Sequence, residues 1–403
     1  MPTLKTALLT LVLSALAAQT CWAESVVDAE DQEPFISMTA SHAAQWCSDD
    51  SSCVSPAANA FYNRADGLLF YLGVRYRSEN HLHPRLTALR GWHSARSGAY
   101  YELDVEQPLF GQDSFAFGVS LYDRTAWSEE DAANITDVEN DLLALFLRQE
   151  ERDYYQEEGF SIFARQQAGQ RLSLGLEYKD ADLSSLAAAQ SVWSVFRQNA
   201  EWRENPPLQL GVLNGAADFE GRMKSYEVSF TYDSREGAEW RGWLARGRVE
   251  NARKTGGSDY EYRRISLDVS RKLRISNTQT LALRGAWGVG SGTDFPSHRL
   301  FYLGGLGTLR GYEYREFVGK NLFFASAEYG VRVRPSVELI YFVDSGEVWY
   351  GTSGFDWDEL KSNMGIGVRF EAPGVGDVRV NVARPMTTQE ADTVVSLRLV
   401  FPS

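Results

Sequence analysis

One arginine lies inside a glycine-rich stretch of the chain, and two carboxylates downstream could bind it. The stretch is Leu303-Gly304-Gly305-Leu306-Gly307-Thr308-Leu309-Arg310-Gly311-Tyr312. Glycines at this density let a backbone fold tightly on itself, whereas a guanidinium taken out of water needs a charged partner. Glu328 and Asp344 lie in the right phase of the segments that follow. If the stretch folds back onto those segments, we expect Arg310 to make charge-assisted hydrogen bonds with both carboxylates.

This cluster predicts a structural ion pair, because paired charges in a shielded place usually support a fold and do no chemistry. His81 and His83 are expected to lie in a turn, since no cluster of further metal ligands accompanies them. The stretch from Gly288 to Gly292 has its serine in the wrong place for a G-x-S-x-G nucleophile elbow. The sequence therefore predicts no catalytic residue, no metal site and no cofactor, and we do not expect an enzyme.

Alternation of apolar and polar residues fills the chain from about Phe61 to its end, which is the period of a β-strand with two unlike faces. Many apolar faces end in Tyr, Trp or Phe, and the polar faces are densely charged. These features are typical of a barrel with an aromatic girdle at a membrane interface and a water-filled lumen. Segments of about 9 to 11 residues predict sixteen strands, near 58–64, 67–77, 85–94, 99–108, 115–125, 158–167, 171–180, 224–233, 239–250, 260–273, 279–290, 321–333, 337–349, 362–372, 377–384 and 393–401.

The lengths of the connections predict which end of the strands faces which compartment. Connections after even-numbered strands are short, and most of those after odd-numbered strands are longer, which assigns turns to the periplasm and loops to the cell exterior. A bilayer accepts strands only when the sheet closes. We therefore expect an all-β fold, a 16-stranded antiparallel transmembrane β-barrel of the outer membrane, with the glycine-rich sixth exterior loop (loop 6) folded into the lumen.

One long loop changes to a helical period. Thr136 and Glu139 have the spacing of a capping box, and apolar residues then recur at helical spacing, which predicts an amphipathic surface helix over 137–152. The alternative, an extra strand, would break the parity of the turns. A further loop, about 183–221, contains Trp193, Phe196 and Trp202, which are expected to fold the loop and not to bind a ligand.

The N-terminus has the pattern of a secretory signal peptide, with Lys5 ahead of an apolar stretch and cleavage expected after Ala23. A lipoprotein, with Cys21 as the lipidated residue, is the weaker alternative. The predicted division is a signal peptide at 1–23, a short periplasmic segment at 24–57 and the barrel at 58–403. Export places the mature chain in an oxidising compartment, so a local disulfide between Cys47 and Cys53 is favoured.

Charge excludes one class of partner. The chain has 40 Lys and Arg against 54 Asp and Glu, a formal net charge of −14. An acidic chain gives no basic footprint for a phosphate backbone, so we expect no nucleic-acid binding. After the N-terminus there is also no apolar run of about 18 residues, which excludes a protein that crosses a membrane with helices.

The glycine-rich stretch and the segments after it resemble the BamA and TamA superfamily of outer-membrane barrels, also called the bacterial surface antigen family. The family hallmark is an Arg-Gly-aromatic tip on the sixth extracellular loop, and Arg310-Gly311-Tyr312 is similar to it. Glu328 matches the acidic residue of the family's strand 12, and Phe342 to Trp349 looks like its aromatic-x-Asp-x-Gly-x-Val-Trp segment. The resemblance covers roughly residues 60 to 403 and is strongest over the last 110.

This resemblance implies a barrel that aids protein insertion or transport at the outer membrane. The implied partners are outer-membrane lipids, and client outer-membrane proteins or a separate periplasmic partner. Family members that insert or export proteins carry POTRA domains ahead of the barrel, whereas 24–57 is too short for one. The alternative is a passive pore or structural barrel without insertase activity. A third hypothesis, an outer-membrane hydrolase, needs a serine or carboxylate constellation, and none stands out.

Overall fold

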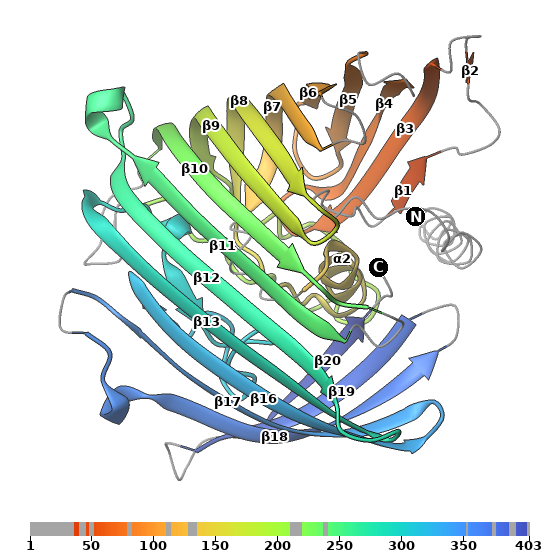
Figure 1. Ribbon diagram of the computed structural model, residues 1–403, viewed down its shortest axis with the longest axis vertical. Coiled ribbons are helices and arrows are strands. Elements are labelled where there is room, and N and C mark those ends of the chain that lie inside the picture. The colour runs from red at the N-terminus through yellow and green to blue at the C-terminus, as the bar shows by residue number, and fades with distance from the viewer. Residues whose placement is uncertain are drawn as a thin grey trace.

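The structure is a computed structural model, and it describes residues 36–39, 46–47, 52–78, 83–109, 114–127, 135–209, 220–236, 241–351, 354–372, 376–386 and 392–400. At 36–39, 46–47, 372 and 400 it describes the backbone alone. These residues form one large, strongly curved antiparallel sheet with few helices (Figure 1). The predicted signal peptide, its cleavage site and Cys21 lie outside the described residues.

Sixteen long strands follow one another along the chain. They are β3 (Ser52–Asn63), β4 (Gly67–Ser78), β5 (Arg85–His93), β6 (Tyr100–Leu109), β7 (Phe115–Trp127), β8 (Tyr154–Ala168), β9 (Leu172–Ser185), β10 (Gly221–Asp233), β11 (Gly242–Ala252), β12 (Glu261–Arg274), β13 (Gln279–Asp294), β16 (Asn321–Arg334), β17 (Val337–Trp349), β18 (Lys361–Ala372), β19 (Gly376–Pro385) and β20 (Val394–Val400). Every predicted strand has its counterpart here, so the sixteen-stranded antiparallel sheet is confirmed.

The first long strand begins earlier than the sequence predicts. β3 starts at Ser52 and pairs with β4 along its whole length, from Ser52 opposite Ser78 to Asn63 opposite Gly67. The strand predicted near 58–64 therefore begins six residues earlier than expected. Small residues and Pro56 hide the alternation there, and proline, which lacks an N–H, is tolerated because β3 is an edge strand.

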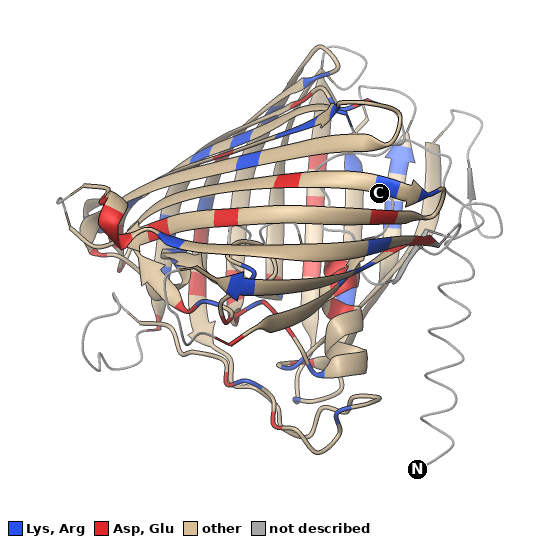
Figure 2. Cartoon of the chain, turned by 90° about the horizontal axis from the view of Figure 1, so that it is seen from below, with Lys and Arg blue, Asp and Glu red and all other residues tan. Residues whose placement is uncertain are grey.

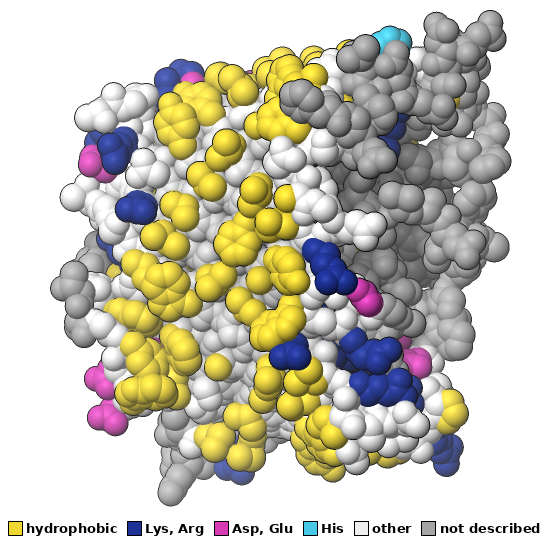
Figure 3. All heavy atoms as spheres, in the orientation of Figure 1, with side chains coloured by type: hydrophobic (Ala, Val, Ile, Leu, Met, Phe, Trp, Pro, Cys, Tyr) yellow, Lys and Arg dark blue, Asp and Glu magenta, His cyan; other side chains and the backbone are white. Residues whose placement is uncertain are grey.

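The two faces of the sheet differ as the alternation predicts. Large apolar side chains on the outer face are exposed, among them Leu176 at 57% and Tyr226 at 64%. Figure 3 shows hydrophobic side chains spread over this face, and Figure 2 shows acidic and basic residues placed along the strands. On β17, exposed Tyr341 and Val343 alternate with buried Phe342 and Asp344. Among the described residues, no helix has the length and apolar character to cross a membrane.

Backbone pairing does not join the first long strand to the last one in the part of the chain that the structure describes. From β3 to β20 each of the sixteen long strands pairs with the next long one, so that β13 pairs with β16, and β20 pairs with β19. The edge of β3 that faces away from β4 pairs instead with two short strands, β1 (Ile36–Thr39) and β2 (Trp46–Cys47). The expected closure by strand pairing is therefore not observed, and Figure 1 shows a gap between β3 and β20.

Long connections gather at one end of the sheet. They contain the helix α2 (Asp137–Leu147), the segment 186–209, and loop 6, which includes the short hairpin of β14 (Phe301–Leu303) and β15 (Phe317–Gly319). Three short 3₁₀ helices, Lys254–Gly256, Ser297–Arg299 and Trp357–Glu359, complete the described elements. The connections at the other end are mostly short, as predicted.

A helix is confirmed here, but it is not the surface helix that the sequence predicts, because its residues from Asp137 to Leu145 are buried, and it ends five residues before the predicted end. The Thr136 side chain accepts the Glu139 N–H at 3.2 Å, as an N-cap does. The helix ends because Arg148 has a left-handed φ of 57° and its N–H caps the last turn. The Glu139 side chain does not turn back to the N-cap as in a capping box, but binds β20, as described below.

The interior at the end with the long loops is packed with side chains. Val138, Leu142 and Leu145 of α2 form one buried cluster with Tyr62 and Trp202. The Trp202 indole donates to the Val192 carbonyl at 2.9 Å, so this tryptophan folds its loop as expected. Phe196 is 72% exposed, and it contacts Phe146 through its ring and through its N–H, which donates to the Phe146 carbonyl at 3.1 Å.

Candidate functional site

Loop 6 brings Arg310 against both predicted carboxylates. Its Nε lies 2.8 Å from Asp344 Oδ2 and its Nη2 lies 2.6 Å from Asp344 Oδ1, which is a bidentate pair. Its Nη1 donates to Glu328 Oε1. Arg310 is 6% exposed and Asp344 is fully buried. The predicted contact of Arg310 with Glu328 and Asp344 is therefore present on the inner face of the sheet.

Further groups hold the two carboxylates in place. The Asp344 carboxylate also accepts hydrogen bonds from the Ser326 hydroxyl at 2.7 Å and the Asn363 amide at 2.9 Å. These three residues form a row across β16, β17 and β18, because Asp344 lies directly opposite Ser326 on one side and Asn363 on the other. The guanidinium also lies 3.7 Å from the centre of the Phe342 ring, a cation–π contact.

Arg379 is a partner that the sequence analysis missed. It lies on β19 and donates to Glu328 from both terminal nitrogens, at 2.9 and 3.1 Å, so that this carboxylate bridges two arginines. Its Nε donates to Asn381 at 2.6 Å. The signal was present in the sequence, since Arg379 and Asn381 occupy the polar phase of a strand whose other face is Val378, Val380 and Val382.

The glycines of the stretch allow loop 6 to pass close to other backbone. Gly304 has a φ of +115°, and a Cβ there would lie 2.0 Å from the Glu313 carbonyl oxygen. A Cβ at Gly311 would lie 2.7 Å from Asn363 Cβ. Gly305 has a φ of +93°, and the Gly307 carbonyl accepts from Arg284 at 2.8 Å. The tight turn expected of the glycine-rich stretch is therefore real.

Tyr312 completes the tip of loop 6. Its ring packs with Leu303, Leu309 and Phe324 in a buried cluster, and its hydroxyl donates to the Ser362 carbonyl at 3.3 Å. The tip is thus anchored by one charge on Arg310 and one aromatic ring on Tyr312, with Gly311 between them against β18.

The connection after α2 binds loop 6 from its other side. The Leu306 N–H points at both oxygens of Glu151, at 3.0 and 2.7 Å. Burial raises the pKa of the Glu151 carboxyl to about 8. Asp153 forms ion pairs with Arg315 of loop 6 and with Arg64 and Arg203, and these arginines lower its pKa despite burial.

Arg64, in the turn between β3 and β4, is fully buried and ties this network to the first strands. Its guanidinium lies 3.0 Å from Glu150, 2.9 Å from Asp153 and 2.8 Å from Asn205. The sequence analysis did not single out Arg64, because its partners come from two loops whose fold is not visible in a strand pattern.

Helix α2 contacts both edge strands of the gap. Asp141 Oδ2 accepts the Tyr62 N–H of β3 at 2.9 Å. Glu139 Oε1 accepts the Leu399 N–H of β20 at 2.9 Å, and both Glu139 oxygens pair with the Arg398 guanidinium at 3.0 and 2.9 Å. We name this region the seam: β3, α2 and β20 with these contacts.

The cysteine prediction is supported in part. Cys53 is disulfide-bonded, and it lies directly opposite Cys47 in the pairing of β2 with β3. The Cys47 side chain lies outside the described side chains, so the identity of the partner stays a prediction. Cross-strand neighbours of this kind lie within reach of an S–S bond.

The described residues contain no group of three or more His, Cys, Asp and Glu that could hold a metal ion. His83 lies beside Ser78, with its Nδ1 3.1 Å from the hydroxyl, and His81 lies outside the described residues. The absence of catalytic activity stays a prediction.

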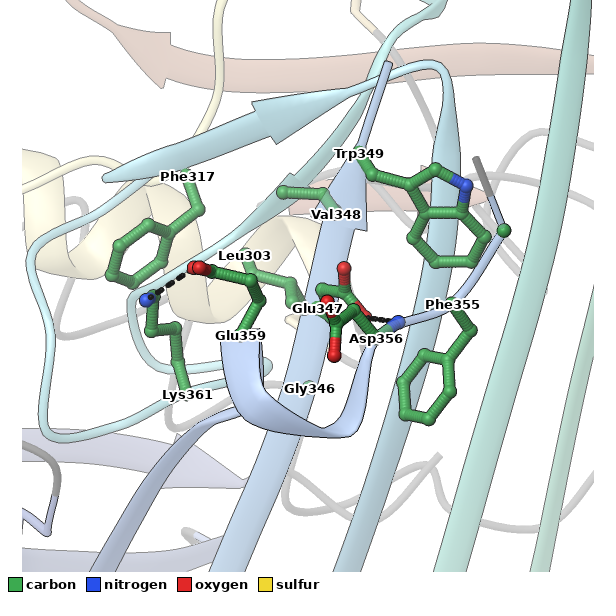
Figure 4. A pocket seen from close by; sticks show the side chains of 11 residues that line it. Leu303, Phe317, Gly346, Glu347, Val348, Trp349, Phe355, Asp356, Glu359 and Lys361 are labelled. Atoms are coloured by element: carbon green, nitrogen blue, oxygen red, sulfur yellow. Dashed lines mark hydrogen bonds and ion pairs between the residues drawn. The ribbon is translucent and has the colours of Figure 1, made fainter. Parts of the chain in front are cut away.

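A pocket of about 360 Å³ lies beside loop 6, between β17 and the connection that follows it (Figure 4). Phe317, Trp349 and Phe355 supply aromatic walls. Its polar groups bind each other, since Glu347 accepts the Asp356 N–H at 2.9 Å and Lys361 pairs with Glu359 at 3.4 Å. The described residues that line the pocket therefore show no arrangement of acid, base and nucleophile.

Comparison with known proteins agrees with this geometry. A family model described as the Omp85 superfamily domain matches residues 87–401. The outer membrane protein assembly factor BamA of Nitratidesulfovibrio vulgaris is 30% identical over 107 residues, which is 23% of this chain and 13% of the relative. The chain therefore matches only a small part of that relative.

One solved structure shares the fold, and a second matches with a lower score. The crystal structure of BamA from Haemophilus ducreyi lacking POTRA domains 1–3 has a TM-score of 0.56 at 15% identity, covering 87% of this chain and 69% of that one. CdiB from Acinetobacter baumannii has a TM-score of 0.45 at 11% identity, covering 89% and 58%. A BamA-like barrel implies a location in the bacterial outer membrane. With a family model that matches most of its length, the chain belongs to the Omp85 superfamily.

Proposed function

We propose that this chain aids the insertion or transport of proteins at the outer membrane, and that client strands enter at the seam between β3 and β20. The observation that carries the proposal is the state of the two edge strands. In the described residues they do not pair with each other, and their N–H groups at Tyr62 and Leu399 bind side-chain carboxylates.

Such an edge can accept an incoming strand. A strand that adds to a sheet edge binds through main-chain hydrogen bonds, which do not depend on the sequence of the client. Edge strands left open are a liability that proteins usually cover. Here the cover on β20 is the Glu139 side chain, which a client carbonyl group can replace at the Leu399 N–H.

The partners follow from the two surfaces. The exposed apolar outer face suits outer-membrane lipids, and the seam suits client outer-membrane proteins. A separate periplasmic partner could deliver clients to the end of the sheet with short turns. We propose that the chain reaches this membrane through its N-terminal signal peptide, cleaved after Ala23, and that it acts without enzymatic chemistry or a cofactor.

Insertion of a test barrel into liposomes checks the proposal. Purified protein is reconstituted, an unfolded eight-stranded barrel is added, and its folding is followed by protection from protease. Liposomes with the protein should fold the test barrel faster than empty liposomes or liposomes with an unrelated porin. Equal rates in all three, with conductance through the chain, would favour the passive pore instead.

A further inference from the structure

Helix α2 lies between two strands that a closed barrel would pair directly. On one side Asp141 accepts the Tyr62 N–H of β3, and on the other Glu139 accepts the Leu399 N–H of β20. Glu139 is 1% exposed and Asp141 is 2% exposed, so both carboxylates are taken out of water. Figure 1 shows the helix in the gap between the two strands.

The spacing of the two acids explains how one short helix serves both strands. Residues advance by about 100° around an α-helix, so Glu139 and Asp141, two positions apart, project from nearly opposite sides. A helix placed between two edges can therefore direct one carboxylate to each. Val138 and Leu142 pack in a cluster that Tyr62 and Leu399 also join, so the apolar face of α2 contacts both strands as well.

The same cover continues along β3. Just past the end of β3, in the turn to β4, the Arg64 N–H donates to Glu150 at 3.1 Å, and the Arg64 carbonyl accepts the Ala189 N–H at 2.8 Å. Farther down this edge, β1 pairs opposite Ala57–Ala60. Loop segments and the short strand β1 thus occupy the backbone groups at the edge of β3 with which β20 or a client strand would pair.

This cover is suited to removal. An 11-residue helix is marginal on its own and depends on its packing. Buried carboxylates carry a large desolvation cost that their partners only offset. When a backbone carbonyl replaces a carboxylate at the same N–H, the hydrogen bond is kept and the carboxylate returns to water.

Helix α2 is also connected to loop 6. Leu143 of α2 packs with Leu306 and with Leu397 of β20. Glu151, four residues after the helix, accepts the Leu306 N–H. A movement of α2 away from the seam would therefore break these contacts with Leu306, in the loop that contains Arg310.

We propose that α2 is an internal inhibitor of the seam, which occupies the edge N–H groups of β3 and β20 through Asp141 and Glu139 until a polypeptide strand displaces it. The inference rests on the proposed function for the identity of the displacing strand, but the competition between α2 and a strand can be measured without insertion activity.

The first test weakens the helix contacts without changing side-chain size. The full chain with Glu139→Gln and Asp141→Asn is compared with the unchanged protein in detergent micelles. The probe is a fluorescent peptide with the sequence of residues 392–403, which contains the last strand. The double variant should bind the peptide about tenfold more tightly, because neutral amide oxygens hold the two edge N–H groups less strongly than carboxylates and Glu139→Gln also removes the ion pair with Arg398. The amides of Tyr62 and Leu399 should exchange with solvent correspondingly faster.

A matched control uses another pair of carboxylates. Glu158 and Asp182 are exposed and directly opposite each other in β8 and β9. The double variant Glu158→Gln with Asp182→Asn removes two negative charges from the sheet, as the seam variant does. This control should bind the peptide as tightly as the unchanged protein. Equal peptide affinity in the seam variant, the control and the unchanged protein would overturn the proposal.

The second test fixes the helix in place and guards against a variant that fails to fold. Glu139→Cys with Arg398→Cys places one thiol on α2 and one on β20. Cysteine side chains are shorter than the glutamate and arginine whose ends now touch, so a bifunctional maleimide joins the two thiols and ties α2 to β20. The cross-linked protein should lose peptide binding, and the same variant without the reagent should keep it. Ser173→Cys with Thr231→Cys, directly opposite each other in β9 and β10, is the control cross-link and should have no effect. Undiminished binding in the cross-linked seam variant would contradict the proposal.

The outcomes separate the two proposals. Tighter peptide binding in the freed variant, with no insertion by any protein, would support the inhibitory helix and reject the insertase function. Insertion that proceeds at the same rate with α2 tied to β20 would support the insertase function and reject the inhibitory helix.

Discussion

Arg310 and Asp344 are joined by two hydrogen bonds at once, from Nε and Nη2 to the two carboxylate oxygens, in a place where Asp344 has no exposed surface. Removal of either partner leaves a buried charge without its counter-ion, which is far more costly than the loss of a surface pair. This pair therefore fixes the position of loop 6 on the inner face of the sheet.

Arg310→Ala should lower the free energy of unfolding by roughly 3–5 kcal/mol, because Asp344 and Glu328 lose their shared cation. Arg310→Lys should recover only part of the loss, since an ammonium group cannot form the two parallel bonds. Urea titration in detergent measures both. Arg274→Ala, at the exposed end of β12, is the control and should change stability little, because its hydrogen bonds go only to the exposed turn that follows, at Ser276 and Asn277. A loss as small as that of the control would show that the pair does not hold the loop.

Arg310→Ala should also raise the ion conductance of the barrel in planar bilayers. Loop 6 now packs against β16, β17 and β18 on the inner face, so a released loop leaves more of the lumen to water and ions. Single-channel recording of the variant, the Arg274→Ala control and the unchanged protein checks this. Identical conductance in all three would mean that loop 6 does not restrict the lumen.

Gly304→Ala should destabilise loop 6, because its φ of +115° disfavours a side chain and the added Cβ would lie 2.0 Å from the Glu313 carbonyl oxygen. We expect a loss of about 1–3 kcal/mol in the free energy of unfolding. Gly256→Ala is the matched control, since nothing lies within 4 Å of a Cβ there. Equal stability of the two variants would contradict the tight turn.

Stability should depend on pH through Glu151. Burial raises its pKa from about 4.5 to about 8; the Leu306 N–H, Arg398 and Arg203 act in the opposite direction, and Glu139 adds to the rise. Between pH 4.5 and pH 8 the Glu151 carboxyl therefore holds its proton in the folded protein but loses it in the unfolded chain. The stabilisation is thus fully present below pH 4.5 and is lost as the pH rises through 8.

The measurement is the free energy of unfolding at pH 5 and pH 9, for the unchanged protein and for Glu151→Gln. The variant keeps an acceptor for Leu306 but cannot titrate, so its loss of stability over this range should be smaller by up to about 4 kcal/mol. Parallel pH profiles for the two proteins would show that Glu151 is already ionised at pH 5.

Much of this structure could be predicted from the sequence, for a physical reason. Strands with one apolar and one charged face alternate visibly, so all sixteen were placed, and the arginine of the glycine-rich stretch pointed to Glu328 and Asp344. The start of β3 was missed because Ser52 to Ala58 contains few large apolar residues. The apolar–polar alternation that identifies a strand cannot be recognised where small side chains occupy its outer face.

The seam could not be predicted, because a periodic pattern identifies a helix but not what the helix covers. Thr136 and Glu139 indicated where α2 begins, yet the Glu139 side chain binds Arg398 and Leu399, about 260 residues away. The contact of Arg379 with Glu328 has the same origin. Such contacts are set by how far the sheet curves, which no local stretch of sequence specifies.

The most direct test of the account follows a client at the seam itself. A photo-cross-linking amino acid is placed at position 399 or, as a control on the opposite wall, at position 231, and the test barrel is inserted into proteoliposomes under illumination. The account predicts cross-links between position 399 and the terminal strands of the test barrel, and few or none from position 231. Insertion without a cross-link at 399, or with equal cross-links at both positions, would contradict it.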